Sequence, residues 1–124
     1  MKYISTDKAP SAVGPYSQAI KLNNGYLYIS GQLGLIPETM KLPTDIITQT
    51  LQALKNIDEI LKVENYLKDN VIKTTILLTN IDDFPEVNKI YETFFVNHKP
   101  ARSTFAVKAL PKNALIEIEV IAFK

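Results

Sequence analysis

The sequence predicts a single α+β domain in which two helices cover one face of a β-sheet. The chain has 124 residues, a length that suits one domain. Runs typical of strands lie at both ends of the chain, and two segments with helical periodicity lie in its middle, separated by one strand. The expected order is therefore two or three strands, a helix, a strand, a helix and two strands, which builds a layer of two helices on one sheet.

The chain is expected to begin with a hairpin. Asn23-Asn24-Gly25 separates two extended-looking runs, Tyr16 to Leu22 and Tyr26 to Ser30. An Asn-Gly pair between such runs favours a tight turn, because both residues tolerate the left-handed conformation. A loop bounded by Pro37 and Pro43 follows the hairpin.

The first helix is expected after this loop. Thr44 is a suitable N-cap, and Asp45 suits the first turn because of the helix dipole. Apolar residues recur at three- and four-residue spacing and predict a core-facing stripe: Ile47, Leu51, Leu54, Ile57 and Leu61. Asn65 tolerates the left-handed conformation that often ends a helix.

The second half of the chain alternates strand, helix and strand patterns. Val71 to Leu78 is rich in β-branched residues and predicts a strand, and Asp82 or Asn80 is suited to cap a second helix. The expected apolar face of that helix is Phe84, Val87, Tyr91 and Phe94. Two more strands are predicted, from Ser103 to Ala109 and from Leu115 to Phe123.

Two helices leave the second face of the sheet uncovered. In the hairpin, Tyr26, Tyr28 and Ser30 alternate with Leu27 and Ile29. In the later strand, Thr104, Ala106 and Lys108 alternate with Phe105 and Val107. The face opposite the more aliphatic one is semi-apolar, so we expect it to pack against other subunits. The alternative is an ordinary solvated sheet face.

Composition removes several classes of function. Fourteen basic and thirteen acidic residues leave a charge of +1, so we do not expect a nucleic-acid partner. The chain has no cysteine, and His98 is its only histidine, so we expect no metal site. We expect His98 to be exposed at the end of a helix. Neither a secretory signal nor an apolar run of membrane-spanning length is apparent, so we expect a cytoplasmic protein.

A few polar residues are candidates for chemistry. Arg102 stands at the entrance to a strand, where a guanidinium could bind a carboxylate or phosphate through two hydrogen bonds. Glu117 and Glu119 share one face of the last strand and could act as general acid or base. The alternatives are a surface arginine and a solvated strand face.

The remaining candidates are a serine before a glycine, a tyrosine in a turn and a threonine. Ser30 is followed by Gly31, which allows the backbone to approach a ligand closely. The turn from Gly14 to Gln18 presents the phenol of Tyr16, although such a tyrosine more often packs in a core or an interface. Thr104 could hold a water molecule but is not an activated nucleophile without a nearby base.

Together, six segments in this order closely resemble the RidA (YjgF-type) reactive intermediate deaminase family. They are Gly14-Pro15-Tyr16-Ser17-Gln18-Ala19, Ile29-Ser30-Gly31-Gln32, Lys73-Thr74-Thr75, Val87-Asn88-Lys89-Ile90-Tyr91, Pro100-Ala101-Arg102-Ser103-Thr104 and Ile116-Glu117-Ile118-Glu119-Val120-Ile121-Ala122. The resemblance implies a chorismate-mutase-like fold and a homotrimer with clefts between subunits. It also implies hydrolysis of enamines and imines, such as 2-aminoacrylate and 2-iminobutanoate released by pyridoxal-phosphate enzymes, to 2-keto acids and ammonia, with no cofactor or metal.

The same resemblance implies roles for particular residues. Arg102 would clamp the substrate carboxylate, and Glu117 would activate the attacking water and handle protons. The cleft would be lined by Tyr16, Ser30 and the backbone of Gly31. Thr104 stands where many members have cysteine, which argues against an obligatory thiol nucleophile. The loop before Pro100 is a few residues shorter than usual, which bears on the substrate range.

The sequence is also compatible with two other functions. One is a non-catalytic subunit that senses a small molecule and regulates a partner protein. The other is an endoribonuclease or translation inhibitor, as described for some relatives. The presence of Glu117 favours catalysis over sensing, because binding a carboxylate does not need it.

Overall fold

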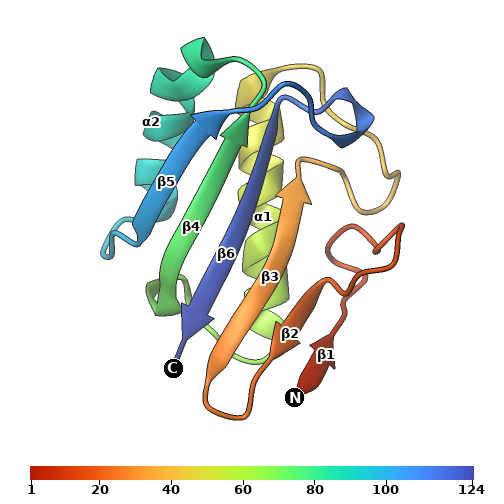
Figure 1. Cartoon of the computed structure of the whole chain (residues 1–124), viewed down its shortest axis with the longest axis vertical. Coiled ribbons are helices and arrows are strands. Elements are labelled where there is room, and N and C mark those ends of the chain that lie inside the picture. The colour runs from red at the N-terminus through yellow and green to blue at the C-terminus, as the bar shows by residue number, and fades with distance from the viewer.

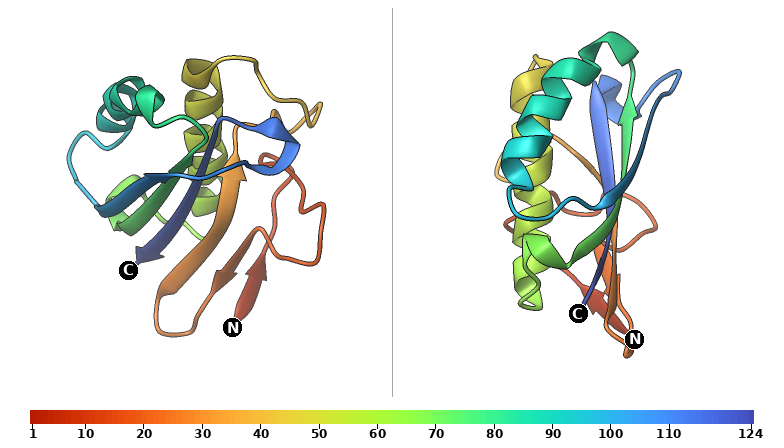
Figure 2. Two further views of the ribbon diagram at one scale, coloured as in Figure 1. Left: turned by 45° about the horizontal axis from the view of Figure 1, so that its top comes forward. Right: turned by 90° about the vertical axis from the view of Figure 1, so that its left-hand side faces the viewer.

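A computed structural model describes residues 1–124 and contains one six-stranded sheet with both helices on the same face (Figures 1 and 2). The elements are β1 (Lys2–Ile4), β2 (Ala19–Lys21), β3 (Tyr26–Leu33), α1 (Ile46–Val63), β4 (Val71–Leu78), α2 (Phe84–Phe94), β5 (Ala101–Ala106) and β6 (Ile116–Phe123). The strand order is β1-β2-β3-β6-β4-β5, and only β4 and β5 run parallel. The predicted two-layer α+β fold is therefore confirmed.

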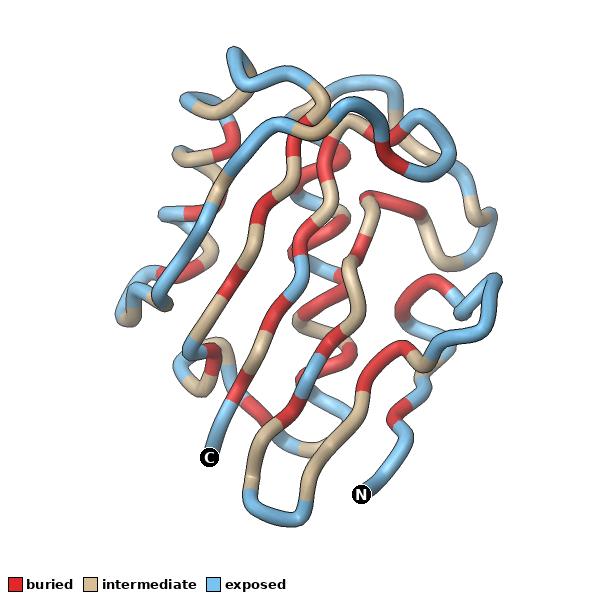
Figure 3. Tube along the Cα trace, in the orientation of Figure 1, coloured by how far each residue is buried: buried red, intermediate tan, exposed pale blue.

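The core lies between the helices and the sheet. One face of β6 supplies Ile116, Ile118 and Val120 to it, each at most 2% exposed. These residues alternate with Glu117 and Glu119, which point to the opposite, helix-free face, as the period of two predicts. Figure 3 shows this alternation along the strands. No helix is both long enough and apolar enough to cross a membrane.

The first helix differs from the prediction at its start and on its inner face. Its N-cap is Asp45 rather than Thr44, because the Asp45 side chain accepts a hydrogen bond from the Thr48 backbone N–H at 2.8 Å. Ile47 and Leu51, predicted to face the core, are 45% and 54% exposed. The other three members of the predicted stripe are buried.

Polar residues take the inner positions that the apolar pattern missed. Asn56 is fully buried, and its side-chain amide donates to the carbonyls of Leu33 (3.1 Å) and Leu35 (2.9 Å). Gln49 donates to the Pro43 carbonyl and accepts from the Leu115 N–H. These bonds fix the loops that leave β3 and enter β6, so the inner face of α1 anchors the end of the sheet that carries Glu117.

The segment around the second helix largely follows the prediction. Asn80 accepts a bond from the Asp82 N–H and caps a short 3₁₀ turn, after which α2 begins. Val87 and Tyr91 are buried on the expected apolar face, with Phe84 and Phe94 packed partly against the core.

The last helix–strand connection departs from the prediction. His98 is not an exposed helix-end residue. It lies four residues beyond α2, is half-buried, and its Nε2 is 2.5 Å from the carbonyl oxygen of Val71.

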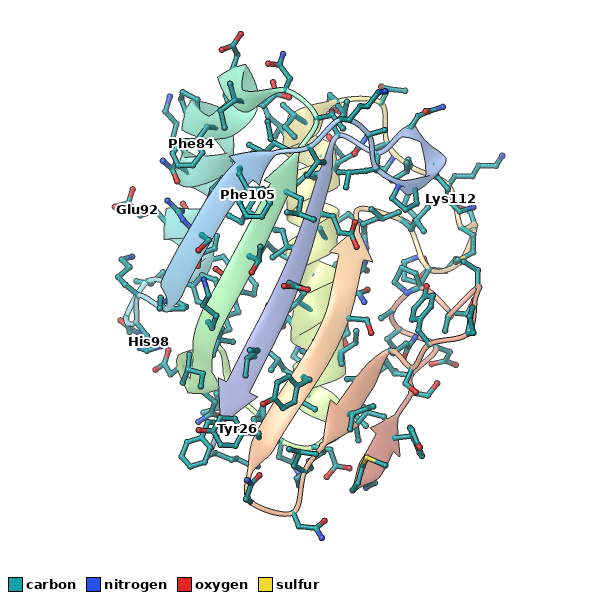
Figure 4. All side chains as sticks on the ribbon, in the orientation of Figure 1. Tyr26, Phe84, Glu92, His98, Phe105 and Lys112 are labelled. Atoms are coloured by element: carbon teal, nitrogen blue, oxygen red, sulfur yellow. The ribbon has the colours of Figure 1, made fainter.

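The two faces of β5 are the reverse of those expected. The parallel register sets Arg102 opposite Thr74 and Thr104 opposite Ile76, so both β5 residues point to the helix side. Phe105, on the more aliphatic side of the predicted alternation, is instead 50% exposed on the helix-free face (Figure 4). Tyr28 and Phe123 are also exposed on that face. These aromatic rings support the prediction of a subunit interface there.

Candidate active site

The candidate general acid or base, Glu117, lies on the helix-free face of β6 beside a glycine of β3. The pairing of β3 with β6 shifts its register between Ile29 and Gln32, and Gly31 lies in this irregular stretch. A Cβ atom on Gly31 would overlap the carboxyl group of Glu117. Glycine at this position therefore leaves room for the carboxylate, which lines a cavity of about 340 Å³ together with Tyr16, Ser30 and Gln32.

The environment of Glu117 favours its protonated form. Burial raises the pKa of the Glu117 carboxyl above the ordinary glutamate value of 4.5, and the nearby negative charge of Glu119 raises it further. No protein group donates a hydrogen bond to this carboxylate to offset the desolvation. A carboxyl with a raised pKa holds and releases a proton closer to neutral pH, which suits general acid–base catalysis.

Hydrogen bonds hold the loop that carries Tyr16 against β3. The Ser30 hydroxyl donates to the Ser17 carbonyl at 2.6 Å, and the Ser30 N–H donates to the Gln18 carbonyl at 3.0 Å. The buried side chain of Gln18 binds backbone groups of Thr6 and Pro10 in turn. Tyr16 is half-exposed at the cavity. The structure thus brings Glu117, Gly31, Ser30 and Tyr16 together around one cavity.

Arg102 lies at the far edge of the sheet, against α2. Its Nη1 donates to Asn88 Oδ1 at 2.8 Å, and its guanidinium carbon lies 4.9 Å from the ring centroid of Tyr91 and 5.2 Å from that of Phe84. Arg102 lines an open cavity of about 450 Å³ that also includes Lys99 and Pro100. The guanidinium is exposed, so it is accessible to an incoming anion.

Thr104 shares the helix side of β5 with Arg102. Its Oγ1 is buried and has no hydrogen-bond partner within the chain. An unpaired buried hydroxyl costs roughly 1–3 kcal/mol. A bound water or a polar group of a ligand would remove that cost.

These residues form two half-sites on opposite faces of one sheet. Arg102 and Thr104 point to the helix side, as the β4 register requires. Glu117 is paired with Leu77 and points to the helix-free side, together with the Gly31 cavity. A single chain therefore does not bring Arg102 and Glu117 to one substrate.

The sequence interpretation gave no role in the site to two residues that contact Arg102. Asn88 and Tyr91 belong to a segment quoted for the resemblance, and their three-residue spacing places both on one side of α2. Burial raises the pKa of Tyr91, although its hydrogen bond to Thr74 and the Arg102 charge act in the opposite direction. The structure contains no group of three or more His, Cys, Asp or Glu side chains that could hold a metal ion.

The protein is thus a small two-layer α+β protein that carries the Glu117 carboxylate and the Arg102 guanidinium on opposite faces of one mixed sheet. Residues 6–124 match the model of the family described as Endoribonuclease L-PSP, and the chain belongs to this family.

Relatives and solved structures confirm the resemblance to RidA proteins. The mouse 2-iminobutanoate/2-iminopropanoate deaminase is 49% identical over 122 residues, covering 98% of this chain and 90% of the relative. The crystal structure of RidA from the Antarctic bacterium Psychrobacter sp. PAMC 21119 has a TM-score of 0.96 at 41% identity and covers 100% of both chains. Escherichia coli TdcF with bound serine has a TM-score of 0.96 at 35% identity, covering 100% of this chain and 99% of TdcF.

Proposed function

We propose that this protein is a hydrolytic deaminase of small 2-imino acids. The substrates are 2-iminobutanoate and 2-iminopropanoate, together with their enamine tautomers such as 2-aminoacrylate. One water molecule adds, the C=N bond is replaced by C=O, and the products are a 2-keto acid and ammonia. The relatives named for this reaction match over nearly the whole chain.

The observation that carries the proposal is the half-buried carboxyl of Glu117 beside Gly31. Its pKa is raised by burial and by Glu119, and the missing Gly31 side chain leaves space in front of it. A surface residue of a simple binding protein needs neither feature. The carboxylate-binding partner is Arg102, whose planar donors match a 2-imino acid's carboxylate.

The proposed mechanism uses one proton donor and acceptor. Glu117 takes a proton from a water molecule as the water oxygen bonds to the imine carbon. Glu117 returns this proton to the nitrogen, which gives a neutral carbinolamine. Glu117 then takes the proton of the carbinolamine hydroxyl and delivers it to the nitrogen, so that the C=O bond forms as the C–N bond breaks and ammonia leaves. Proton transfer of this kind contributes about 100- to 10,000-fold to rate. Tyr16, Ser30 and Gly31 line the cleft, and Thr104 holds a water molecule.

The same proposal includes a homotrimer with a site at each subunit interface. Arg102 and Glu117 lie on opposite faces of the sheet, so a second copy would have to supply the missing half of a shared site. The number of three subunits rests on the family resemblance. The exposed aromatic residues of the helix-free face provide surface for this contact. We also propose a cytoplasmic location, where pyridoxal-phosphate enzymes that act on serine or threonine release these imines.

A coupled assay tests the proposed function. Threonine dehydratase generates 2-iminobutanoate from threonine, and release of 2-oxobutanoate is followed with and without this protein. Faster release that is lost in Arg102→Ala supports the deaminase. Binding of 2-oxobutanoate without faster release would indicate a sensing subunit instead. Salt-sensitive RNA cleavage that survives Arg102→Ala would support the ribonuclease that the family description names.

A further inference from the structure

The guanidinium of Arg102 is held in one orientation before any substrate binds. Nη1 is its only nitrogen that donates a hydrogen bond within the chain, and the acceptor is Asn88 Oδ1 at 2.8 Å. The guanidinium carbon lies over the rings of Tyr91 and Phe84, at 4.9 and 5.2 Å from their centroids. An exposed arginine side chain otherwise samples many rotamers, so these contacts reduce its freedom.

Contacts with the protein core fix the tyrosine ring that packs against the Arg102 guanidinium. The Tyr91 hydroxyl lies 2.7 Å from the Thr74 hydroxyl, and both residues are buried. Thr74 is the residue of β4 that the register places opposite Arg102. The tyrosine ring next to the guanidinium is therefore fixed to the central sheet, and Asn88 lies one helical turn before it on α2.

The unused donors define where a carboxylate can bind. A guanidinium presents five N–H donors in a rigid fork, and a carboxylate takes two parallel ones. With Nη1 bound to Asn88, the Nε–Nη2 edge has no partner in the chain and both of its N–H groups point the same way. This edge can accept a carboxylate without breaking the existing bond to Asn88.

We propose that Asn88 and Tyr91 are positioning residues that hold Arg102 so that its Nε–Nη2 edge receives the substrate carboxylate. The inference rests on the proposed function, because it assigns a role within the same site. Neither residue needs to touch the reacting carbon. Asn88 contributes to carboxylate affinity because its hydrogen bond holds the guanidinium in one orientation. Tyr91 contributes because its ring, bonded to Thr74 in the core, packs against the guanidinium.

The test compares a charged and an uncharged probe on the full-length protein. Binding of 2-oxobutanoate and of 2-oxobutanamide is measured by calorimetry for the wild type, Asn88→Ala and Lys89→Ala. Asn88→Ala is expected to weaken 2-oxobutanoate binding about tenfold, the effect of losing one hydrogen bond to a charged group. Binding of the amide should change less than about twofold, because it has no carboxylate to match the fork. Lys89 is the neighbouring, exposed control on α2 and should change neither value.

Kinetics and stability separate positioning from a structural role. In the coupled assay, Asn88→Ala should raise KM about tenfold and change kcat less than about threefold. Alanine favours a helix more than asparagine does, so the melting temperature should not fall. Tyr91→Phe keeps the ring but loses the bond to Thr74, and should raise KM less than Asn88→Ala does.

Two results would overturn the inference. One is unchanged affinity of Asn88→Ala for 2-oxobutanoate, and the other is an equal loss of affinity for both probes. Failure of the proposed function has a different signature. In that case the wild type would not accelerate 2-oxobutanoate release, whereas the two binding measurements would still show whether Asn88 positions Arg102.

Discussion

The substitution Glu117→Gln tests the proposed chemistry most directly. Glutamine keeps nearly the same shape beside Gly31, so the cavity of about 340 Å³ should persist. The amide can still hydrogen-bond a water molecule but cannot accept or return a proton at neutral pH. Turnover should fall by about 100-fold or more, equivalent to about 2.7 kcal/mol in the activation barrier. Binding of 2-oxobutanoate through Arg102 should survive.

The folded state should tolerate this change. Because the pKa of Glu117 is raised in the folded protein, its contribution to stability is present below the ordinary value of 4.5 and is lost as pH rises through the folded-state pKa. Glutamine does not ionise, so the variant does not lose stability in this way as pH rises. Thermal unfolding at neutral pH should therefore show Glu117→Gln to be no less stable than the wild type.

The assay is the threonine dehydratase coupled reaction, with Glu119→Gln as the matched control. Glu119 shares the strand face but is more exposed, so its substitution should change turnover at neutral pH much less. Removing its charge lowers the pKa of Glu117, so the acid limb of the kcat/KM profile should move to lower pH. Equal losses of turnover in the two variants would refute the assignment of proton transfer to Glu117.

Three further predictions follow from the half-site of β5 and from the assembly. Arg102→Ala should lower kcat/KM by more than about 100-fold with the fold intact, and Arg102→Lys should also be poor because a point charge cannot form the fork. Near-wild-type turnover by the lysine variant would contradict the role of Arg102 in binding the substrate carboxylate through two hydrogen bonds. Thr104→Cys should stay active within about threefold, since no covalent step uses this residue, whereas full activity in Thr104→Val would contradict its water-holding role. Light scattering should give a trimer of about 42 kDa, three times 13.9 kDa, and a monomer at micromolar concentration would contradict the shared site.

Much of the fold could be predicted because local signals determine it. The Asn23-Asn24-Gly25 turn, the strand from Val71 to Leu78 and the apolar face of α2 all depend on neighbouring residues. The inner face of α1 could not be predicted in this way. Asn56 is buried because it satisfies the carbonyls of Leu33 and Leu35, which are distant in sequence. Tertiary contacts decide where such a polar residue is stable.

In the candidate site, too, local sequence predicts some features and tertiary contacts determine the others. The face of Glu117 follows from the period of two in a strand that is buried on one side. The face on which Arg102 lies does not follow from this period, because β5 is an edge strand whose residues are mostly exposed. Only the parallel register of β5 with β4 determines that Arg102 points to the helix side. Its contact with Asn88 joins a strand to a helix and has no signature in local sequence.

The separation of Arg102 and Glu117 onto opposite faces makes two inactive variants able to complement each other. Suppose that each site of a cyclic trimer combines Glu117 of one copy with Arg102 of the next. Any trimer that mixes Arg102→Ala chains with Glu117→Gln chains then contains one interface where both native residues meet. After unfolding and refolding an equal mixture, about a quarter of all sites should be intact. The catalytic unit is then the contact between two chains rather than the chain itself.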